Sequence, residues 1–185
     1  MNRDQALELL NNNLKNKNLI KHCLAVEIAM LGLAKHFNQN QQDWAMAGLL
    51  HDIDYDLVVP DKLDQHSKLG AQMLVEAGLS QEICEAVLTH NEAHGIEPKT
   101  LMGKALHVVD PLTGLIVATT LVLPSKKLAD VKIETIINRM GEKSFAKGAN
   151  REIINKAPQF LDMALSDFID IVLTSMQGIA GDIGL

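Results

Sequence analysis

The sequence predicts an all-α protein that folds as a single-domain helical bundle. Apolar residues occupy 47% of the 185 positions, while aromatic residues make up only 3%. The apolar residues are mainly leucine, alanine, isoleucine and methionine, a composition that favours helices over a β-sandwich. An apolar rhythm of about 3.6 residues runs through most of the chain, and no segment has a convincing strand pattern. This length supports one sizeable core, so we expect one domain spanning residues 1–185.

The apolar rhythm and its interruptions place the individual elements. We expect helices at about 3–13, 18–37, 41–51, 65–77, 80–92, 99–121, 130–140, 149–157 and 162–180. Ser80 and Asn150 lie at the starts of two of these segments as N-caps, and Gly78 closes the helix before Ser80. The segment "DYDLVVPDKLD" interrupts the rhythm with acidic residues and Pro60. We expect it to be a loop that borders the functional site.

Charge, cysteine content and motifs exclude several classes of protein. A net charge of −6 argues against binding nucleic acid polymers through a general basic surface. The charged start lacks the apolar stretch of a secretory leader, and the longest apolar run, "LIVATTLVL", is too short to span a membrane. Cys23 and Cys84 are too few for a disulfide framework, so we expect a cytoplasmic protein with no membrane attachment. The chain has no P-loop, dinucleotide-binding or serine-hydrolase motif.

Histidine and aspartate recur at the ends or on the polar faces of different expected helices. The segments are "LIKHCLAVE" with His22, "GLLHDID" with His51 and Asp52, "DQHSKLGA" with His66, "AVLTHNEAH" with His90, and "ALHVVDPLTG" with Asp110. Imidazole nitrogen and carboxylate oxygen together suit a borderline divalent cation. Such a cation would also offset the cost of crowding carboxylates at the end of an apolar helix.

This order, His then His-Asp then Asp on a helical chain, resembles the HD superfamily of metal-dependent phosphohydrolases. "LLHDI" is close to the motif that names the HDIG subgroup, with Asp54 in place of the glycine. The resemblance covers a core of about residues 18–122 and leaves 123–185 as a helical extension. It implies that His22, His51, Asp52 and Asp110 bind a first metal ion. In binuclear members, which include enzymes that hydrolyse diadenosine tetraphosphate, His66 and His90 would hold a second ion and Asp52 would bridge the two.

Several of these residues have alternative interpretations. His66 and His90 could instead cap a helix or contact substrate. Asp54 could orient a catalytic water or support a ligating imidazole, and Asp56 could do the same, with a solvated acidic loop as the alternative for both. His94 follows His90 by one helical turn and His107 precedes Asp110 by one turn. Both are further candidates to bind the metal or to support a ligand.

Two features depart from the family pattern. Pro111 directly follows Asp110, so we expect the helix that carries this ligand to kink or break there. Members that hydrolyse guanosine tetraphosphate carry a glutamate where this sequence has Tyr55, which makes that substrate less favoured.

Basic residues are concentrated in the extension, where eight of the 17 lysines and arginines fall between positions 126 and 156. We expect Lys126, Lys127, Lys147 and Arg151 to contact a substrate phosphate, with a solvated basic face as the alternative. "PSKK" follows the helix of Asp110, and "SFAKGANRE" offers a glycine turn before a helix.

Together these patterns predict an enzyme that hydrolyses a phosphate ester or phosphoanhydride of a small molecule, and we expect this molecule to be a nucleotide. One or two ions of Fe, Mn, Co, Zn or Ni would activate a water molecule for attack on phosphorus. The alternative is a non-catalytic HD module that binds a nucleotide or a partner and signals through its shape.

Overall fold

The computed structural model describes residues 1–58, 62–142 and 144–185, and all regular structure in these ranges is helical. The all-α prediction is therefore confirmed. The first half of the chain forms α1 (Arg3–Asn13), α2 (Lys17–His36), α3 (Gln41–Leu50), α4 (Tyr55–Val58), α5 (Lys68–Glu76) and α6 (Gln81–His90). The second half forms α7 (Leu101–Val122), α8 (Ile133–Met140), α9 (Arg151–Ile154), α10 (Ala157–Leu161), α11 (Leu165–Gln177) and α12 (Ala180–Ile183). Short 3-10 helices lie at Leu63–Gln65, Glu92–His94 and Leu128–Asp130.

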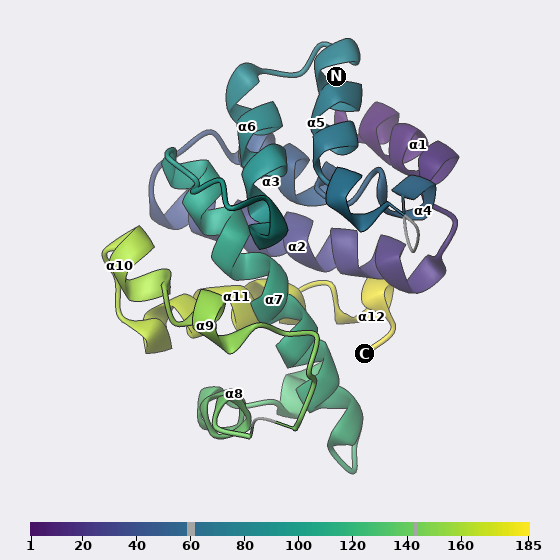
Figure 1. Ribbon diagram of the computed structural model, residues 1–185. Helices are drawn as coiled ribbons and strands as arrows, with labels where there is room; N and C mark the ends of the chain where they lie inside the picture. Colours follow the sequence, from purple (N-terminus) through teal and green to yellow (C-terminus); the bar gives the residue numbers. More distant parts are fainter. Residues whose placement is uncertain (59–61, 143) are drawn as a thin grey trace.

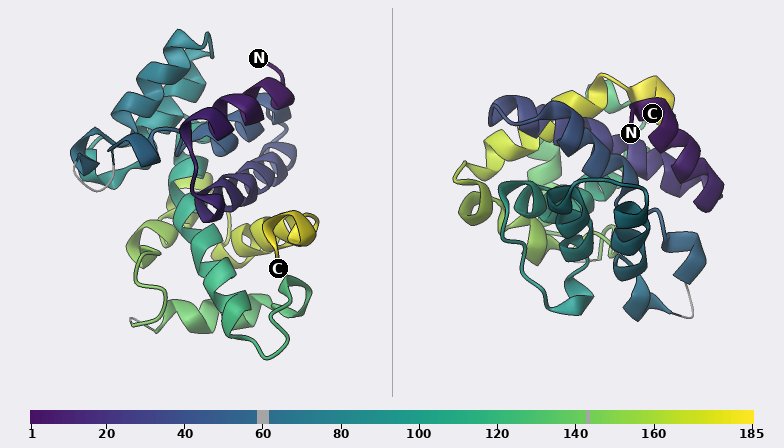
Figure 2. Two further views of the ribbon diagram at one scale, coloured as in Figure 1. Left: turned by 90° about the vertical axis from the view of Figure 1, so that its right-hand side faces the viewer. Right: turned by 90° about the horizontal axis from the view of Figure 1, so that it is seen from above.

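Helix α7 is the central element of the bundle. It contacts α2, α3 and α6 from the first half, and α8, α9, α10 and α11 from the second half. Figure 1 shows α5 and α6 side by side above α2, while α7 descends past α9 toward α8. Helix α2 packs against α3 on one side and α11 on the other, as the left view of Figure 2 shows. This arrangement brings the histidine-bearing helices together around the middle of α7.

The apolar composition of α7 is explained by its place in the core. By length and composition alone this helix could cross a membrane, but 61% of its most apolar 18-residue window is buried inside the protein. Helix α11 packs against α7, and its buried residues recur at helical spacing: Phe168, Ile169, Val172 and Met176.

The expected caps are confirmed. The Ser80 side chain accepts a hydrogen bond from the Ile83 backbone N–H, and the Asn150 side chain accepts from the first turn of α9. Gly78 lies just beyond α5 with a φ of 79°, a left-handed conformation that glycine adopts without steric cost.

The short elements differ from the sequence prediction. His66, expected inside a helix, precedes α5 in a turn, and Ser67 follows it with a φ of 68°. The expected helix at 149–157 is two short helices, α9 and α10, and the second begins with Ala157-Pro158, a position that suits proline. Tyr55 starts the short helix α4 within the expected loop, whereas Pro60 lies outside the described residues.

Candidate metal centre

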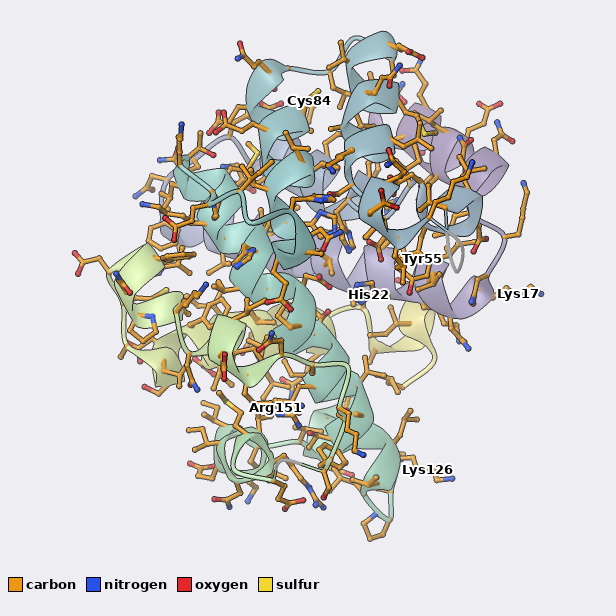
Figure 3. All side chains as sticks on the ribbon, in the orientation of Figure 1. Lys17, His22, Tyr55, Cys84, Lys126 and Arg151 are labelled. Atoms are coloured by element: carbon orange, nitrogen blue, oxygen red, sulfur yellow. The ribbon has the colours of Figure 1, made fainter. Side chains whose placement is uncertain are left out.

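Four histidines and two aspartates from five regions of the chain converge near the middle of the molecule. His22 comes from α2, His51 and Asp52 follow α3, His66 precedes α5, His90 ends α6, and Asp110 lies midway along α7. Figure 3 labels His22 and Tyr55 in this region, where α2 passes below α5 and α6. Three overlapping groups each bring three potential ligand atoms within 4.8 Å of one another. These groups are His22, His51 and Asp52; His51, His90 and Asp110; and Asp52, His66 and His90.

Asp52 lies at the centre of the cluster, and each of its oxygens faces a different pair of histidines. Oδ2 lies 3.4 Å from Nε2 of His51 and 3.8 Å from Nε2 of His22. Oδ1 lies 3.3 Å from Nε2 of His66 and 3.5 Å from Nε2 of His90. The carboxylate therefore divides the imidazoles into two sets, one on each oxygen.

Asp110 belongs to the His22 and His51 side. Its Oδ1 lies 2.9 Å from Nε2 of His22 and 3.8 Å from Nε2 of His51. The expected break at Pro111 does not occur, because α7 continues through this residue to Val122. Buried neighbours such as Val109 hold the helix in the core, and tertiary packing overrides the local preference against an internal proline.

Backbone carbonyls orient the rings of His51 and His90. Nδ1 of His51 lies 2.9 Å from the Gly48 carbonyl oxygen, and Nδ1 of His90 lies 2.6 Å from that of Val87. The last carbonyls of a helix lack an intrahelical donor, so a histidine at the helix end satisfies one of them. A carbonyl only accepts, so Nδ1 must donate and Nε2 is the nitrogen directed at Asp52.

Side chains orient the other two rings. Nδ1 of His66 lies 2.8 Å from Oδ1 of Asp54, whose Oδ2 accepts the Gly70 N–H at 2.8 Å. Nδ1 of His22 lies 3.3 Å from the hydroxyl oxygen of Thr113, three residues beyond Asp110 on α7. Metal-binding histidines in proteins characteristically hold their second nitrogen in this way.

The two acidic candidates beyond Asp52 have different environments. Asp54 is fully buried, which contradicts the solvated-loop alternative for this residue and places it as a support for His66. Asp56 points away from the cluster and accepts hydrogen bonds from the backbone of Lys15 and Asn16, so it fastens α4 to the start of α2.

His94 and His107 contact the backbone of the cluster histidines. Nε2 of His94 lies 2.6 Å from the His66 carbonyl oxygen and 2.9 Å from the Ser67 hydroxyl. Nδ1 of His107 lies 3.1 Å from the His90 carbonyl oxygen. Both residues thereby support the segments that carry His66 and His90.

Carboxylates and imidazoles in the cluster shift one another's pKa values. Burial alone would lower the pKa of His51, but the charges of Asp52 and Asp110 and a hydrogen bond to Asp52 raise it to about 9. The pKa of His66 rises to about 10, because hydrogen bonds to Asp52 and Asp54 outweigh the opposing effect of burial. Burial would raise the pKa of Asp52, yet its imidazole partners hold it well below its ordinary range. Cations can replace these protons as the partners of the carboxylates.

Two cavities open onto the cluster. One, of about 460 Å³, is bordered by His22, Asp52, Tyr55 and the loop 146–149. The other, of about 140 Å³, is bordered by His90 and His107, and both cavities share His66 and Asp110. A larger cavity of about 780 Å³ lies between α1, α2 and α3, and the described residues that line it include no histidine.

The four expected phosphate contacts lie in three different environments. Lys147 lines the 460 Å³ cavity beside the cluster. Arg151 turns its guanidinium toward the carbonyl oxygens of the loop before α9. Lys126 and Lys127 lie beyond the end of α7, and at 1.5 Å per residue the helix alone separates Asp110 from Val122 by about 18 Å. Figure 3 accordingly shows Lys126 at the far end of the molecule from His22.

Sequence reasoning did not single out three supporting groups. These are the hydroxyl of Thr113, the N–H of Gly70 and the loop-binding role of Arg151. Thr113 had a signal, since a residue three positions after Asp110 shares its helix face. The other two depend on tertiary contacts that no sequence spacing reveals.

Comparison with known families assigns this arrangement. A search of solved structures found no significant match. The sequence model of the HD domain, whose superfamily comprises metal-dependent phosphohydrolases, matches residues 19–115, slightly more than half of the chain. This range includes every histidine and aspartate of the cluster. The chain therefore belongs to the HD domain family.

Proposed function

We propose that this protein hydrolyses the phosphate ester or phosphoanhydride of a small molecule, a nucleotide, with one or two divalent ions. The observation that carries the proposal is the position of Asp52, whose two oxygens each face a separate pair of Nε2 atoms. A buried carboxylate between two such sets has the donor geometry of a bridging ligand.

The donor set fits a metal centre in both chemistry and spacing. Two ligands bound about 2.1 Å from one ion lie roughly 3.0–3.5 Å apart, close to the 2.9–3.8 Å separations between Nε2 and carboxylate oxygen in the cluster. Nε2 of His22 also lies 3.2 Å from Nε2 of His51. Two ring nitrogens facing each other at this distance need a proton or a cation between them.

Each ion would have its own ligands. The first would be held by His22, His51, Asp52 and Asp110, and the second by Asp52, His66 and His90. Mixed imidazole and carboxylate donors suit Fe, Mn, Co, Zn or Ni rather than calcium or magnesium. Ions bound there would supply an activated water and neutralise charge on the phosphoryl oxygens.

The chain supplies a compartment for the rest of the substrate. The 460 Å³ cavity lies within the usual size range for small-molecule sites. Its lining also includes Leu19, Tyr55 and Pro111, which offer apolar surface to a leaving group such as a nucleoside. Asp54 is fully buried and is not among the described residues that line this cavity, and its two oxygens bond His66 and Gly70. Its contribution is to keep the ring of His66 in place.

Phosphate release tests the proposal. Protein loaded separately with each of the five metals is assayed against p-nitrophenyl phosphate, nucleoside monophosphates and dinucleoside polyphosphates. We expect turnover with at least one metal, and Asp52→Asn should lower it by more than about 100-fold together with metal content. Asp56→Asn is the matched control, because Asp56 has the same side chain four residues away but binds the backbone of Lys15 and Asn16. Metal-replete wild-type protein that releases no phosphate from any of these compounds would support the non-catalytic module instead.

A further inference from the structure

The loop 145–150 lies outside the part of the chain that the HD domain matches, yet it forms part of the wall around the cluster. Ala146, Lys147, Gly148 and Ala149 line the 460 Å³ cavity together with His22 and Asp52. Gly148 and Asn150 also border the 140 Å³ cavity. The loop therefore borders both cavities that open onto the cluster.

The Arg151 side chain forms hydrogen bonds with the backbone of this loop. The guanidinium of Arg151 donates to the carbonyl oxygens of Phe145, Ala146 and Ala149, the last two at 2.5 Å. The Ala149 N–H closes a turn onto the Ala146 carbonyl at 2.9 Å, and Ala146 has a φ of 41°. A charged fork that binds three carbonyls holds a defined backbone shape.

A second contact fixes the loop to the helix that carries His90. Nδ2 of Asn150 donates to both carboxylate oxygens of Glu92 at 2.9 Å, and Glu92 begins the 3-10 helix that follows α6 after Asn91. Arg151 thus binds the loop from within, and Glu92 holds the loop through Asn150. The loop's position relative to the cluster is built into the fold.

The loop 145–150 contributes one positively charged side chain to the lining of the 460 Å³ cavity. Among the described residues that line the 460 Å³ space, Lys147 is the one lysine or arginine. Its side chain is exposed and its charge is available for an anion. Sites for polyphosphate chains combine several cationic or backbone donors along the chain, whereas one ammonium group matches one phosphate.

We propose that Lys147 contacts the phosphate of a substrate with a single phosphate group, a phosphomonoester, and that Arg151 is a positioning residue that holds Lys147 in place. This inference rests on the proposed function and narrows it to a substrate class. Arg151 acts through the loop, because its guanidinium is occupied by backbone carbonyls.

Binding of inorganic phosphate to the metal-loaded protein, measured by calorimetry, tests the role of Lys147 without turnover. Lys147→Gln should weaken phosphate binding by about tenfold, the loss expected for one charge-assisted hydrogen bond. Lys126→Gln is the matched control, because this exposed lysine lies beyond α7, and it should bind phosphate like the wild type. Lys147→Gln should also raise KM with little change in kcat. A Lys147→Gln protein that binds phosphate as tightly as Lys126→Gln overturns the assignment.

A double-mutant cycle tests whether Arg151 acts through Lys147. Arg151→Lys keeps the charge but loses the three-carbonyl fork, so it should weaken phosphate binding, and Lys147→Gln combined with it should be no weaker than Lys147→Gln alone. Hydrogen exchange of the Ala149 amide in metal-free protein should accelerate in Arg151→Lys and stay unchanged in Lys147→Gln. Additive losses in the cycle, or unchanged exchange in Arg151→Lys, contradict the positioning role.

Comparing the turnover of mono- and triphosphates tests the proposed substrate class. The wild-type protein should have a higher kcat/KM for a nucleoside monophosphate than for the corresponding triphosphate. Equal or faster turnover of the triphosphate contradicts the single-phosphate assignment while leaving the phosphohydrolase proposal intact. If the wild-type protein hydrolyses none of the compounds tested, the proposed function itself fails.

Discussion

Oδ1 of Asp54 lies 2.8 Å from Nδ1 of His66, on the side of the ring opposite the Asp52 contact. The same carboxylate accepts the Gly70 N–H at 2.8 Å and has no exposed surface. Asp54 therefore joins the turn after α3 to the first turn of α5. It also fixes which nitrogen of His66 faces the cluster.

Asp54→Asn should weaken metal binding on the His66 side while preserving the fold. The amide oxygen can still accept from Gly70, but the amide nitrogen then faces Nδ1 of His66 and favours the tautomer with a proton on Nε2. Loss of such a support typically lowers metal affinity or activity by about 10–100-fold. Metal titration and thermal melting of the variant measure both effects. Wild-type affinity in Asp54→Asn, equal to that of Asp56→Asn, would contradict this role.

The stability of the metal-free protein should depend on pH in a defined direction. The pKa of His51 is raised from 6.5 to about 9 and that of His66 to about 10. A raised histidine pKa stabilises the fold fully below about pH 6.5, and this contribution disappears as pH rises through the folded-state pKa. The lowered pKa of Asp52 contributes above about pH 3.8 and is lost as pH falls below this value.

Chelator-treated protein should consequently be most stable between about pH 4 and pH 6.5 and should lose on the order of a few kcal/mol by pH 10. For a chain of this size, each kcal/mol corresponds to a fall in Tm of about 2–4 °C. Metal-loaded protein should lose less over the same range, because bound ions replace the histidine protons and bind more tightly as pH rises. A Tm of the chelated protein that stays constant from pH 6.5 to pH 10 would show that His51 and His66 lack these shifts.

Much of the fold could be predicted because its long helices have strong apolar periodicity. The expected range 3–13 coincides with α1, and the expected helix at 41–51 differs from α3 by one residue. The failures are short or context-dependent elements. Helix α4 has only four residues, and α7 continues through Pro111, where the nearby Val109 and Leu112 are buried in the core.

The candidate site shows a similar division. Residue type and order pointed to the six cluster residues through their resemblance to the HD superfamily, and the structure brings these six side chains together. Charge density alone did not place the basic residues, since the sequence cannot show that Lys126 follows a long rigid helix while Lys147 returns to the cluster. The role of Arg151 depends on carbonyls within its own loop, which composition does not reveal.

Gly48→Ala should destabilise the protein because α2 and α3 approach closely at this residue. A methyl group there would lie 2.8 Å from the Val26 carbonyl oxygen and 2.9 Å from the backbone of Glu27. Backbone atoms cannot move aside cheaply, so the cost should be about 1–3 kcal/mol. Gly114→Ala is the control, since a methyl group at that position on α7 meets nothing within 4 Å and alanine favours helix by up to about 1 kcal/mol. Denaturant unfolding should give opposite signs for the two variants, and equal stabilities would contradict the close packing of α2 on α3.

Removing a histidine should change the number of bound metal ions differently on the two sides of Asp52. His66 and His90 face Oδ1, so His66→Ala or His90→Ala should reduce the bound metal from about two ions to about one and lower hydrolysis steeply. His22 faces Oδ2 with Asp110, and His22→Ala should disturb both ions because they share the Asp52 carboxylate. His36→Ala is the control, because His36 is exposed at the end of α2 and should retain wild-type stoichiometry. Elemental analysis of these variants distinguishes one centre from two: wild-type protein that saturates with one ion, and keeps it in His66→Ala and His90→Ala, would leave a mononuclear site held by His22, His51, Asp52 and Asp110.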